Sequence, residues 1–203
     1  MDPATGQDAM RIHITHDKST TDLLWDIGKA KADWFRQNNW TSSLSRLVRF
    51  GLSVVEAEHY QQFLGLAGEA AVWQWLWGDL GEFWEQQAWL HESKALSDGG
   101  QDLPGLDVKT RDLIYHREIH QPDLLLTPHR INETIHYVLS VVSLAEPFKP
   151  LETDVHICGT ISGLTVSHLQ QRWFNAELKR LVIPQEELSP VQILRWQEHG
   201  VNQ

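Results

Sequence analysis

The chain has 203 residues, of which 41% are hydrophobic and 22% charged, and its formal net charge is −10. This length suits one domain with a single core, and the acidic balance argues against a nonspecific basic coat for nucleic acid. The single cysteine, Cys158, excludes an intrachain disulfide and indicates a reducing compartment, and no apolar run approaches the roughly 18 residues of a membrane span.

The amino-terminal part of the chain is predicted to be mainly helical. Residues 1–10 lack the basic and apolar regions of a signal peptide, so we expect a tail or a remnant of cloning, and a cytoplasmic location. A short strand is predicted at 11–15. Apolar residues at helical spacing then predict two helices between 20 and 51, separated near 38–43.

A long helix is predicted over about 53–77. Ser53 followed by Glu56 is a capping-box signature at its start, and the apolar pattern continues for several turns. Gly65 and Gly68 lie on one face of this helix. Because glycine has no side chain, this face permits close approach of another element.

From residue 98 onward the hydrophobic pattern changes to the alternation that is typical of strands. We predict strands near 102–103, 106–115, 123–127, 135–144 and 154–159. The chain is then expected to return to helix, first from a cap at Ser167 to about residue 178 and again at 189–200. This order of helices, mixed sheet and helices predicts an α/β (α+β) fold.

A Pro-Gly pair with acids on both sides predicts a two-residue turn between two short strands. Such a turn would set Leu103 opposite Leu106 and Asp102 opposite Asp107. Lys109 would share a face with Asp107, because strand side chains alternate. A divalent cation would relieve the repulsion between the two carboxylates; the simpler alternative is an ordinary edge strand with a charged, solvated face.

Four stretches of the chain occur in a recognisable order: 65-GLAGEAAVWQWLWGD-79, Asp102, 107-DVKT-110 and 156-HICGTISG-163. This order resembles the PD-(D/E)XK nuclease superfamily, which has the restriction-endonuclease-like fold, and in particular its small phage-type members. The resemblance implies a mixed central sheet flanked by helices, in a single nuclease-like domain over 11–203. Its expected parts are an N-terminal helical region (11–52), a catalytic core (53–163) and C-terminal helices (164–203).

The resemblance also implies the residues of an active site. In this superfamily an acid near a hairpin and a (D/E)-x-K strand hold one or two Mg²⁺ ions, often with a glutamate from a helix. The implied metal-binding set in this chain, with Mg²⁺ or Mn²⁺ as the cofactor, is Glu69, Asp102, Asp107 and Val108. The implied catalytic set adds a lysine that assists the attacking water: Asp102, Asp107, Lys109 and Glu69. Asp98 is an alternative to Asp102 as the first acid.

The resemblance implies a metal-dependent DNA endonuclease from a bacterium or a phage-infected host. Many enzymes of this fold act as homodimers, so a dimer is also an expectation. RNA as the substrate, and a nick or a double-strand break as the product, remain open. A second hypothesis is a non-catalytic protein that keeps this fold for binding, as a partner in a phage, defence or transposition complex; the net charge of −10 and the 10 tryptophans favour it.

A further group of polar residues begins at 116-HREIH-120 and continues with His129 and His136. A zinc site is one interpretation, but this segment is not the HExxH pattern of metalloproteases. The favoured alternatives are polar residues of the sheet or contacts to phosphate. Several basic residues nearby in the sequence suggest the phosphate contacts: Arg111, Arg117, His129 and Arg130. The sequence has no glycine-rich phosphate loop of the nucleotide-binding type.

Overall fold

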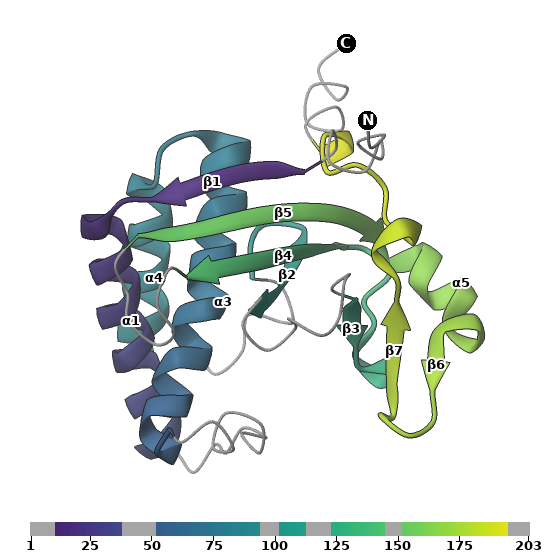
Figure 1. Ribbon diagram of the computed structural model, residues 1–203, viewed down its shortest axis with the longest axis horizontal. Coiled ribbons are helices and arrows are strands. Elements are labelled where there is room, and N and C mark those ends of the chain that lie inside the picture. Colours follow the sequence, from purple (N-terminus) through teal and green to yellow (C-terminus); the bar gives the residue numbers. More distant parts are fainter. Residues whose placement is uncertain (1–10, 38–51, 94–101, 113–122, 145–151, 195–203) are drawn as a thin grey trace, which may run out of the picture.

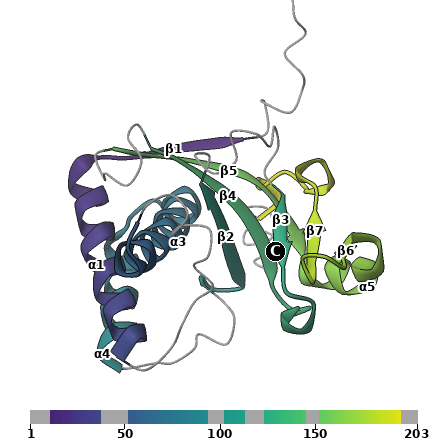
Figure 2. The same cartoon turned by 60° about the horizontal axis from the view of Figure 1, so that its bottom comes forward.

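The computed structural model describes residues 11–37, 52–93, 102–112, 123–144 and 152–194 (Figure 1). A four-stranded sheet separates two other layers (Figure 2). On one face lie the helices α1 (Lys18–Gln37), α3 (Val54–Trp77) and α4 (Gly81–Ser93), and on the other lie a three-stranded sheet and helix α5 (Gly163–Trp173). The chain is therefore mixed α/β, with a mixed sheet flanked by helices.

Helix α3 has the limits that its capping residues predict. The Ser53 hydroxyl accepts a hydrogen bond from the Glu56 amide, and the Glu56 carboxylate accepts one from the Ser53 amide. These bonds satisfy two amides that the first helical turn leaves without partners. The helix ends at Gly78, whose φ of 87° is accessible to glycine at little cost.

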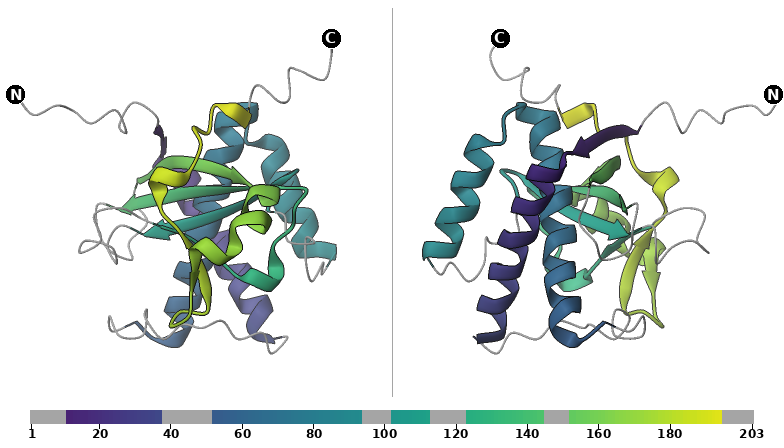
Figure 3. Two further views of the ribbon diagram at one scale, coloured as in Figure 1. Left: turned by 90° about the vertical axis from the view of Figure 1, so that its right-hand side faces the viewer. Right: turned by 60° about the vertical axis from the view of Figure 1, so that its left-hand side comes forward.

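Helices α1 and α4 lie beside α3 (Figure 3), and aromatic side chains form part of these contacts. Trp25 of α1 meets Phe63 of α3 edge to face, with 5.3 Å between ring centroids, and Trp73 of α3 meets Phe83 of α4 at 5.9 Å. Such pairs stabilise a contact beyond the apolar area that they bury. The helix expected in the first part of 20–51 is confirmed as α1. The second helix expected there falls on residues 38–51, which lie outside the described residues. Helix α4 is an element that the sequence analysis missed.

The four-stranded sheet has the order β1-β5-β4-β2. Strands β4 (His136–Leu144) and β5 (Thr153–Ser162) are central, β1 (Ile12–His16) pairs antiparallel with β5, and β2 (Leu106–Asp112) pairs parallel with β4. The other side of β2 has no partner strand among the described residues. The strands predicted near 11–15, 106–115, 123–127, 135–144 and 154–159 are confirmed with shifted ends, whereas the strand predicted near 102–103 is only an isolated bridge between Leu103 and Leu106. Strand β5 is longer than expected, and the end expected for β2 lies in the segment 113–122, which is outside the described residues.

Strand β2 presents apolar side chains to the helices and charged side chains to the opposite face. Leu106 and Val108 are buried in the core beneath α3, which requires Asp107 and Lys109 to point away from that helix. The predicted alternation is therefore confirmed. At Gly68 helix α3 crosses the sheet closely, because a Cβ there would lie 2.1 Å from the Thr110 hydroxyl.

The carboxyl-terminal part of the chain forms a small sheet where the sequence analysis expected helices. Its strands, in the order β3-β7-β6, are β3 (Leu124–Leu126), β7 (Arg180–Ile183) and β6 (Phe174–Asn175). Two short helices adjoin it, η3 (Pro128–Arg130) and η4 (Gln185–Glu187). The helix expected from a cap at Ser167 to about 178 is confirmed over 167–173, but both its ends are wrong. Helix α5 begins at Gly163 with a cap from the Ser162 hydroxyl and ends at Trp173.

The physical reason for this correction lies in the residues after Trp173. In β7 the apolar side chains of Leu181 and Ile183 alternate with more exposed neighbours, and both pair with β3, so burial in a sheet outweighs helix propensity here. The helix expected at 189–200 is also altered at its start, because the Ser189 backbone pairs with Thr160 of β5. The rest of that segment, 195–203, lies outside the described residues.

Two apolar cores lie on opposite faces of the central sheet. The first includes Phe63 and Val138 beneath α3, and the second includes Leu139 and Leu181 beneath the small sheet. Cys158 is buried in the second core, where burial raises the pKa of its thiol to about 11, so it behaves as the small apolar residue that the sequence predicts. None of the described helices is both long and apolar enough to cross a membrane.

Candidate functional site

The turn before β2 holds Asp102 at the free edge of the central sheet. Leu103 and Leu106 exchange backbone hydrogen bonds of 3.1 and 2.9 Å around the predicted turn, and Gly105 has a φ of 70°. The pairing then stops, because the Asp102 carboxylate accepts a hydrogen bond of 2.8 Å from the Val108 amide. The expected strand pairing of Asp102 with Asp107 is therefore wrong, although the two side chains do meet through a hydrogen bond.

Asp107 and Lys109 form an ion pair on the face of β2 that points away from α3. The Asp107 side chain is 11% exposed and the Lys109 side chain 39% exposed, so the lysine is the member that solvent and a ligand can reach. The two residues are neighbours on one face because strand side chains repeat every second residue. Their pairing is the part of the site that the D-x-K pattern predicts.

Glu69 is the third carboxylate of the site and comes from the helix layer. It is 7% exposed, which is rare for a glutamate without a partner or a function. Gly65 lies one turn earlier, and a Cβ at Gly65 would stand 3.7 Å from the Glu69 Oε1 atom. The negative charge of Glu69 acts on both Asp102 and Lys109, so the helix acid belongs to the same cluster as the hairpin acid and the strand pair.

Burial and the other two carboxylates of the cluster hold Asp102 in its protonated form. Its pKa is raised to about 9, first by burial, then by the charge of Glu69 and by the hydrogen bond to Asp107, and the charge of Lys109 offsets only part of this. A carboxyl group with so high a pKa carries a proton at neutral pH. Asp102 can therefore donate a hydrogen bond to Asp107 while its other oxygen accepts from Val108.

Lys109 remains an ammonium group in this cluster. Burial alone would lower its pKa, but the nearby charges of Asp107, Asp102 and Glu69 together raise the pKa above the ordinary value for lysine. A lysine of this kind does not serve as a proton acceptor near neutral pH. It can instead place a positive charge and up to three hydrogen-bond donors beside a negatively charged group.

Val108 contributes through its backbone, because its side chain is buried in the core beneath α3. Its amide points to the free edge of β2, toward Asp102. In a strand the amide and the carbonyl of one residue point to the same side, so the Val108 carbonyl also faces that edge. An oxygen ligand is thus directed to the side of the strand on which Asp102 lies.

Within the described residues, no three histidine, cysteine or carboxylate side chains are already grouped as metal ligands. Around Asp107, the Lys109 ammonium forms an ion pair and the Asp102 side chain forms a hydrogen bond. The donor chemistry nonetheless fits a hard divalent cation, since every candidate ligand is an oxygen. A dipositive ion would supply the positive charge that the shared proton and the ammonium now supply.

The other residues that the sequence analysis singled out do not join this cluster in the described structure. Asp98 and the segment 116–120 lie outside the described residues. His129 is exposed on η3, and His136 begins β4, where its Nδ1 atom has no hydrogen-bond partner. These two histidines form no metal-ligand group with a third described residue.

Tyr137 is a residue near the site that the sequence analysis missed. It lies beside Asp107 in the parallel pairing of β2 and β4, and the charge of Asp107 adds to burial in raising the pKa of its phenol. Its hydroxyl accepts a hydrogen bond of 2.8 Å from the Asn132 amide and donates one of 3.4 Å to the Arg130 carbonyl. Tyr137 therefore ties the segment after η3 to the strand next to the candidate site.

No protein-family model matches the chain, and no curated protein and no solved structure matches it either.

Proposed function

We propose that the protein is a metal-dependent DNA endonuclease of the PD-(D/E)XK type, with the restriction-endonuclease-like arrangement of a mixed sheet between helices. The observation that carries the proposal is the convergence of Glu69, Asp102, Asp107 and Lys109 from a helix, a turn and an edge strand. The cluster brings three acids and a lysine together at a cost in electrostatic repulsion, and perturbed pKa values of this kind are common at functional sites.

The oxygen ligands proposed for Mg²⁺ or Mn²⁺ are the carboxylates of Glu69, Asp102 and Asp107 and the carbonyl of Val108. When bound, such an ion polarises a phosphodiester, lowers the pKa of a coordinated water and neutralises charge on the leaving oxygen. The protein supplies the fixed positions of these oxygens. It also supplies partial burial, which strengthens charge interactions within the site.

Lys109 is proposed to act by electrostatic stabilisation. Its ammonium is the most exposed charged group of the cluster, and the surrounding carboxylates keep it protonated. An ammonium in this position orients the attacking water and offsets the negative charge that develops on the phosphoryl oxygens. The cleavage reaction is thus assigned a lysine that donates hydrogen bonds and a set of acids that bind the metal ion.

The test is a cleavage assay with supercoiled plasmid, linear duplex and single-stranded DNA, each with Mg²⁺, Mn²⁺ or EDTA. Lys109→Ala and Asp107→Asn are each expected to lower the rate by at least about a hundredfold, because each removes a charge used in the transition state. Lys29→Ala, which removes an exposed lysine on α1, is the matched control and should cleave like the wild type. Full metal-dependent cleavage by a folded Asp107→Asn protein would contradict the proposed site.

The second candidate function is a non-catalytic protein that keeps this fold to bind a protein partner. A specific observation favours it: large apolar side chains of α5 and the β6–β7 hairpin are 39–51% exposed, namely Leu164, Leu169, Phe174 and Leu178. Calorimetric titration separates the two functions. Absence of Mg²⁺ and Mn²⁺ binding, together with absence of cleavage in every condition, would favour the binding protein over the nuclease.

A further inference from the structure

The small sheet carries its charges at two opposite ends. At one end, where β3 ends and β7 begins, His129, Arg130, Lys179 and Arg180 are all exposed. At the other end, where β3 begins and β7 ends, lie Asp123, Glu186 and Glu187. Asp123 and Glu186 lie close together, because the charge of Glu186 adds to burial in raising the pKa of Asp123. The first group is here named the basic end of the small sheet.

The basic end is held together by the pairing of β3 with β7. Leu126 pairs with Leu181, so Arg180 lies beside Thr127 and donates a hydrogen bond to its hydroxyl. Helix η3, which carries Arg130, begins at the next residue after Thr127. Lys179 stands in the turn between β6 and β7 with a φ of 50°, a left-handed conformation that is uncommon for a residue other than glycine.

The bases of this end differ in their surroundings from two bases of α1, Lys18 and Arg36. On α1, Lys18 pairs with Asp22, and Arg36 pairs with Asp33 and Glu58, so neighbouring acids neutralise these positive charges. No such ion pair to a described residue is formed by Arg130, Lys179 or Arg180. The nearest acid along the hairpin is the exposed Glu177.

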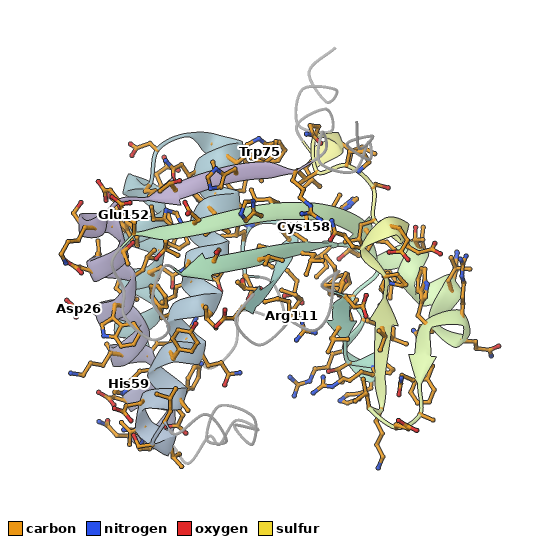
Figure 4. All side chains as sticks on the ribbon, viewed as in Figure 1. Asp26, His59, Trp75, Arg111, Glu152 and Cys158 are labelled. Atoms are coloured by element: carbon orange, nitrogen blue, oxygen red, sulfur yellow. The ribbon has the colours of Figure 1, made fainter. Side chains whose placement is uncertain are left out.

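Tyr137 connects the basic end to the candidate site, whereas Arg111 connects the site to the opposite, acidic end of the small sheet. Arg111 follows Lys109 by two residues on the same face of β2, and its Nε atom donates to the Asp123 carbonyl, 3.3 Å away at the start of β3. Figure 4 shows Arg111 in the space between β2 and β3. The Tyr137 hydroxyl, beside Asp107, holds the backbone of Arg130 and Asn132. The basic end therefore lies on the side of the sheet that carries Asp107 and Lys109.

We propose that Arg130, Lys179 and Arg180 bind the phosphodiester backbone of DNA and position the strand beside Lys109. The inference rests on the proposed nuclease function. Arginine and lysine side chains without carboxylate partners are the groups that contact phosphate oxygens. In a chain with a net charge of −10, approach of a polyanion requires such a local excess of positive charge.

The experiment measures binding without cleavage, by fluorescence anisotropy of a labelled duplex in EDTA. The test variant is the triple change Arg130→Gln, Lys179→Gln and Arg180→Gln. The control is the triple change Lys18→Gln, Lys29→Gln and Lys31→Gln on α1, which alters the net charge equally on the far side of the sheet. The test variant is expected to raise the dissociation constant at least about tenfold and the control less than about twofold, because only the first set contacts phosphate.

Cleavage by the same variants separates this inference from the proposed function. The test variant should raise KM for DNA and keep kcat, whereas Lys109→Ala should lose kcat and still bind DNA in EDTA. Equal weakening by both triple variants, unchanged binding by the test variant, or no binding by the wild type would each overturn the proposed surface. Loss of cleavage in Lys109→Ala would still support the nuclease in each of these cases. Unlabelled single-stranded DNA as the competitor shows whether one strand is sufficient for binding at the basic end.

Discussion

At the scale of single residues, the candidate site is a balance of charges that Asp102 controls. Its pKa is raised from 3.8 to about 9 by burial and by the neighbouring acids, so the folded protein binds a proton that the unfolded chain releases. A group with a raised folded-state pKa contributes stability that is fully present below the unfolded pKa. That contribution is lost as the pH rises through the folded pKa.

We therefore expect the metal-free protein to lose stability between about pH 4 and pH 9, by up to about 1.4 kcal/mol for each pH unit if Asp102 acts alone. Asp102→Asn should remove this slope and be the more stable protein at pH 8. The amide group imitates the protonated acid: its oxygen can accept from Val108 and its nitrogen can donate to Asp107. Urea unfolding in EDTA at several pH values measures both effects, and parallel pH profiles for the two proteins would contradict the assignment.

The sequence predicts those contacts of the site that are local in the chain. The turn between Leu103 and Leu106 and the shared face of Asp107 and Lys109 follow from turn chemistry and strand alternation. Glu69 could be placed near them only through a family resemblance, because nothing in its own helix reveals what lies opposite. Tyr137 could not be predicted, since parallel pairing of β2 with β4 joins residues that are far apart in the sequence.

At the scale of elements, the crossing of α3 over β2 and β4 sets the distance between the helix acid and the strand acid. At Gly68 a Cβ would lie 2.1 Å from the Thr110 Oγ1 atom and 2.4 Å from the Ser140 Oγ atom. These two hydroxyls hydrogen-bond to each other at 3.0 Å, which restricts their movement away from an added methyl group. The missing side chain at Gly68 is therefore required for α3 to lie this close to the sheet.

Gly68→Ala is expected to lower the free energy of unfolding by about 1–3 kcal/mol, the usual effect of overpacking a well-packed contact. It should also weaken Mn²⁺ binding, because it moves the neighbouring Glu69 away from the strand. Gly65→Ala is the matched control, since its Cβ would make an ordinary contact of 3.7 Å and alanine favours helix. Equilibrium denaturation and calorimetric titration test the pair, and equal stability of the two variants would contradict the tight crossing.

The elements that the sequence predicts well are those with strong local signals. The capping box of Ser53 and Glu56 fixes the start of α3, and Gly78 fixes its end. The segment after Trp173 lacks such signals, and there the pairing of β7 with β3 determines the structure instead. The stop of α5 and the β6–β7 hairpin thus depend on tertiary burial, which overrides local propensity and is not visible in a single sequence.

At the scale of the whole molecule, the central sheet separates a helix layer, in which Lys18 and Arg36 are paired with acids, from a small sheet with a basic end. The candidate site lies at the β2 edge of the central sheet, where a helix, a turn and a strand meet. Overall charge predicts only that the chain as a whole repels nucleic acid. The distribution of charge, which depends on the fold, decides whether one face can accept it.

This distribution predicts how binding depends on salt. If Arg130, Lys179 and Arg180 each neutralise one phosphate of a duplex, the logarithm of the binding constant should fall with the logarithm of salt concentration with a slope of about −3. The slope should move to about 0 in the triple variant of Arg130, Lys179 and Arg180, because all three contacts are removed. Anisotropy titrations in EDTA between about 50 and 200 mM KCl measure the slope over a range in which counterion release dominates. A slope that is the same in both proteins would mean that the basic end does not contact phosphate, whether or not the chain cleaves DNA.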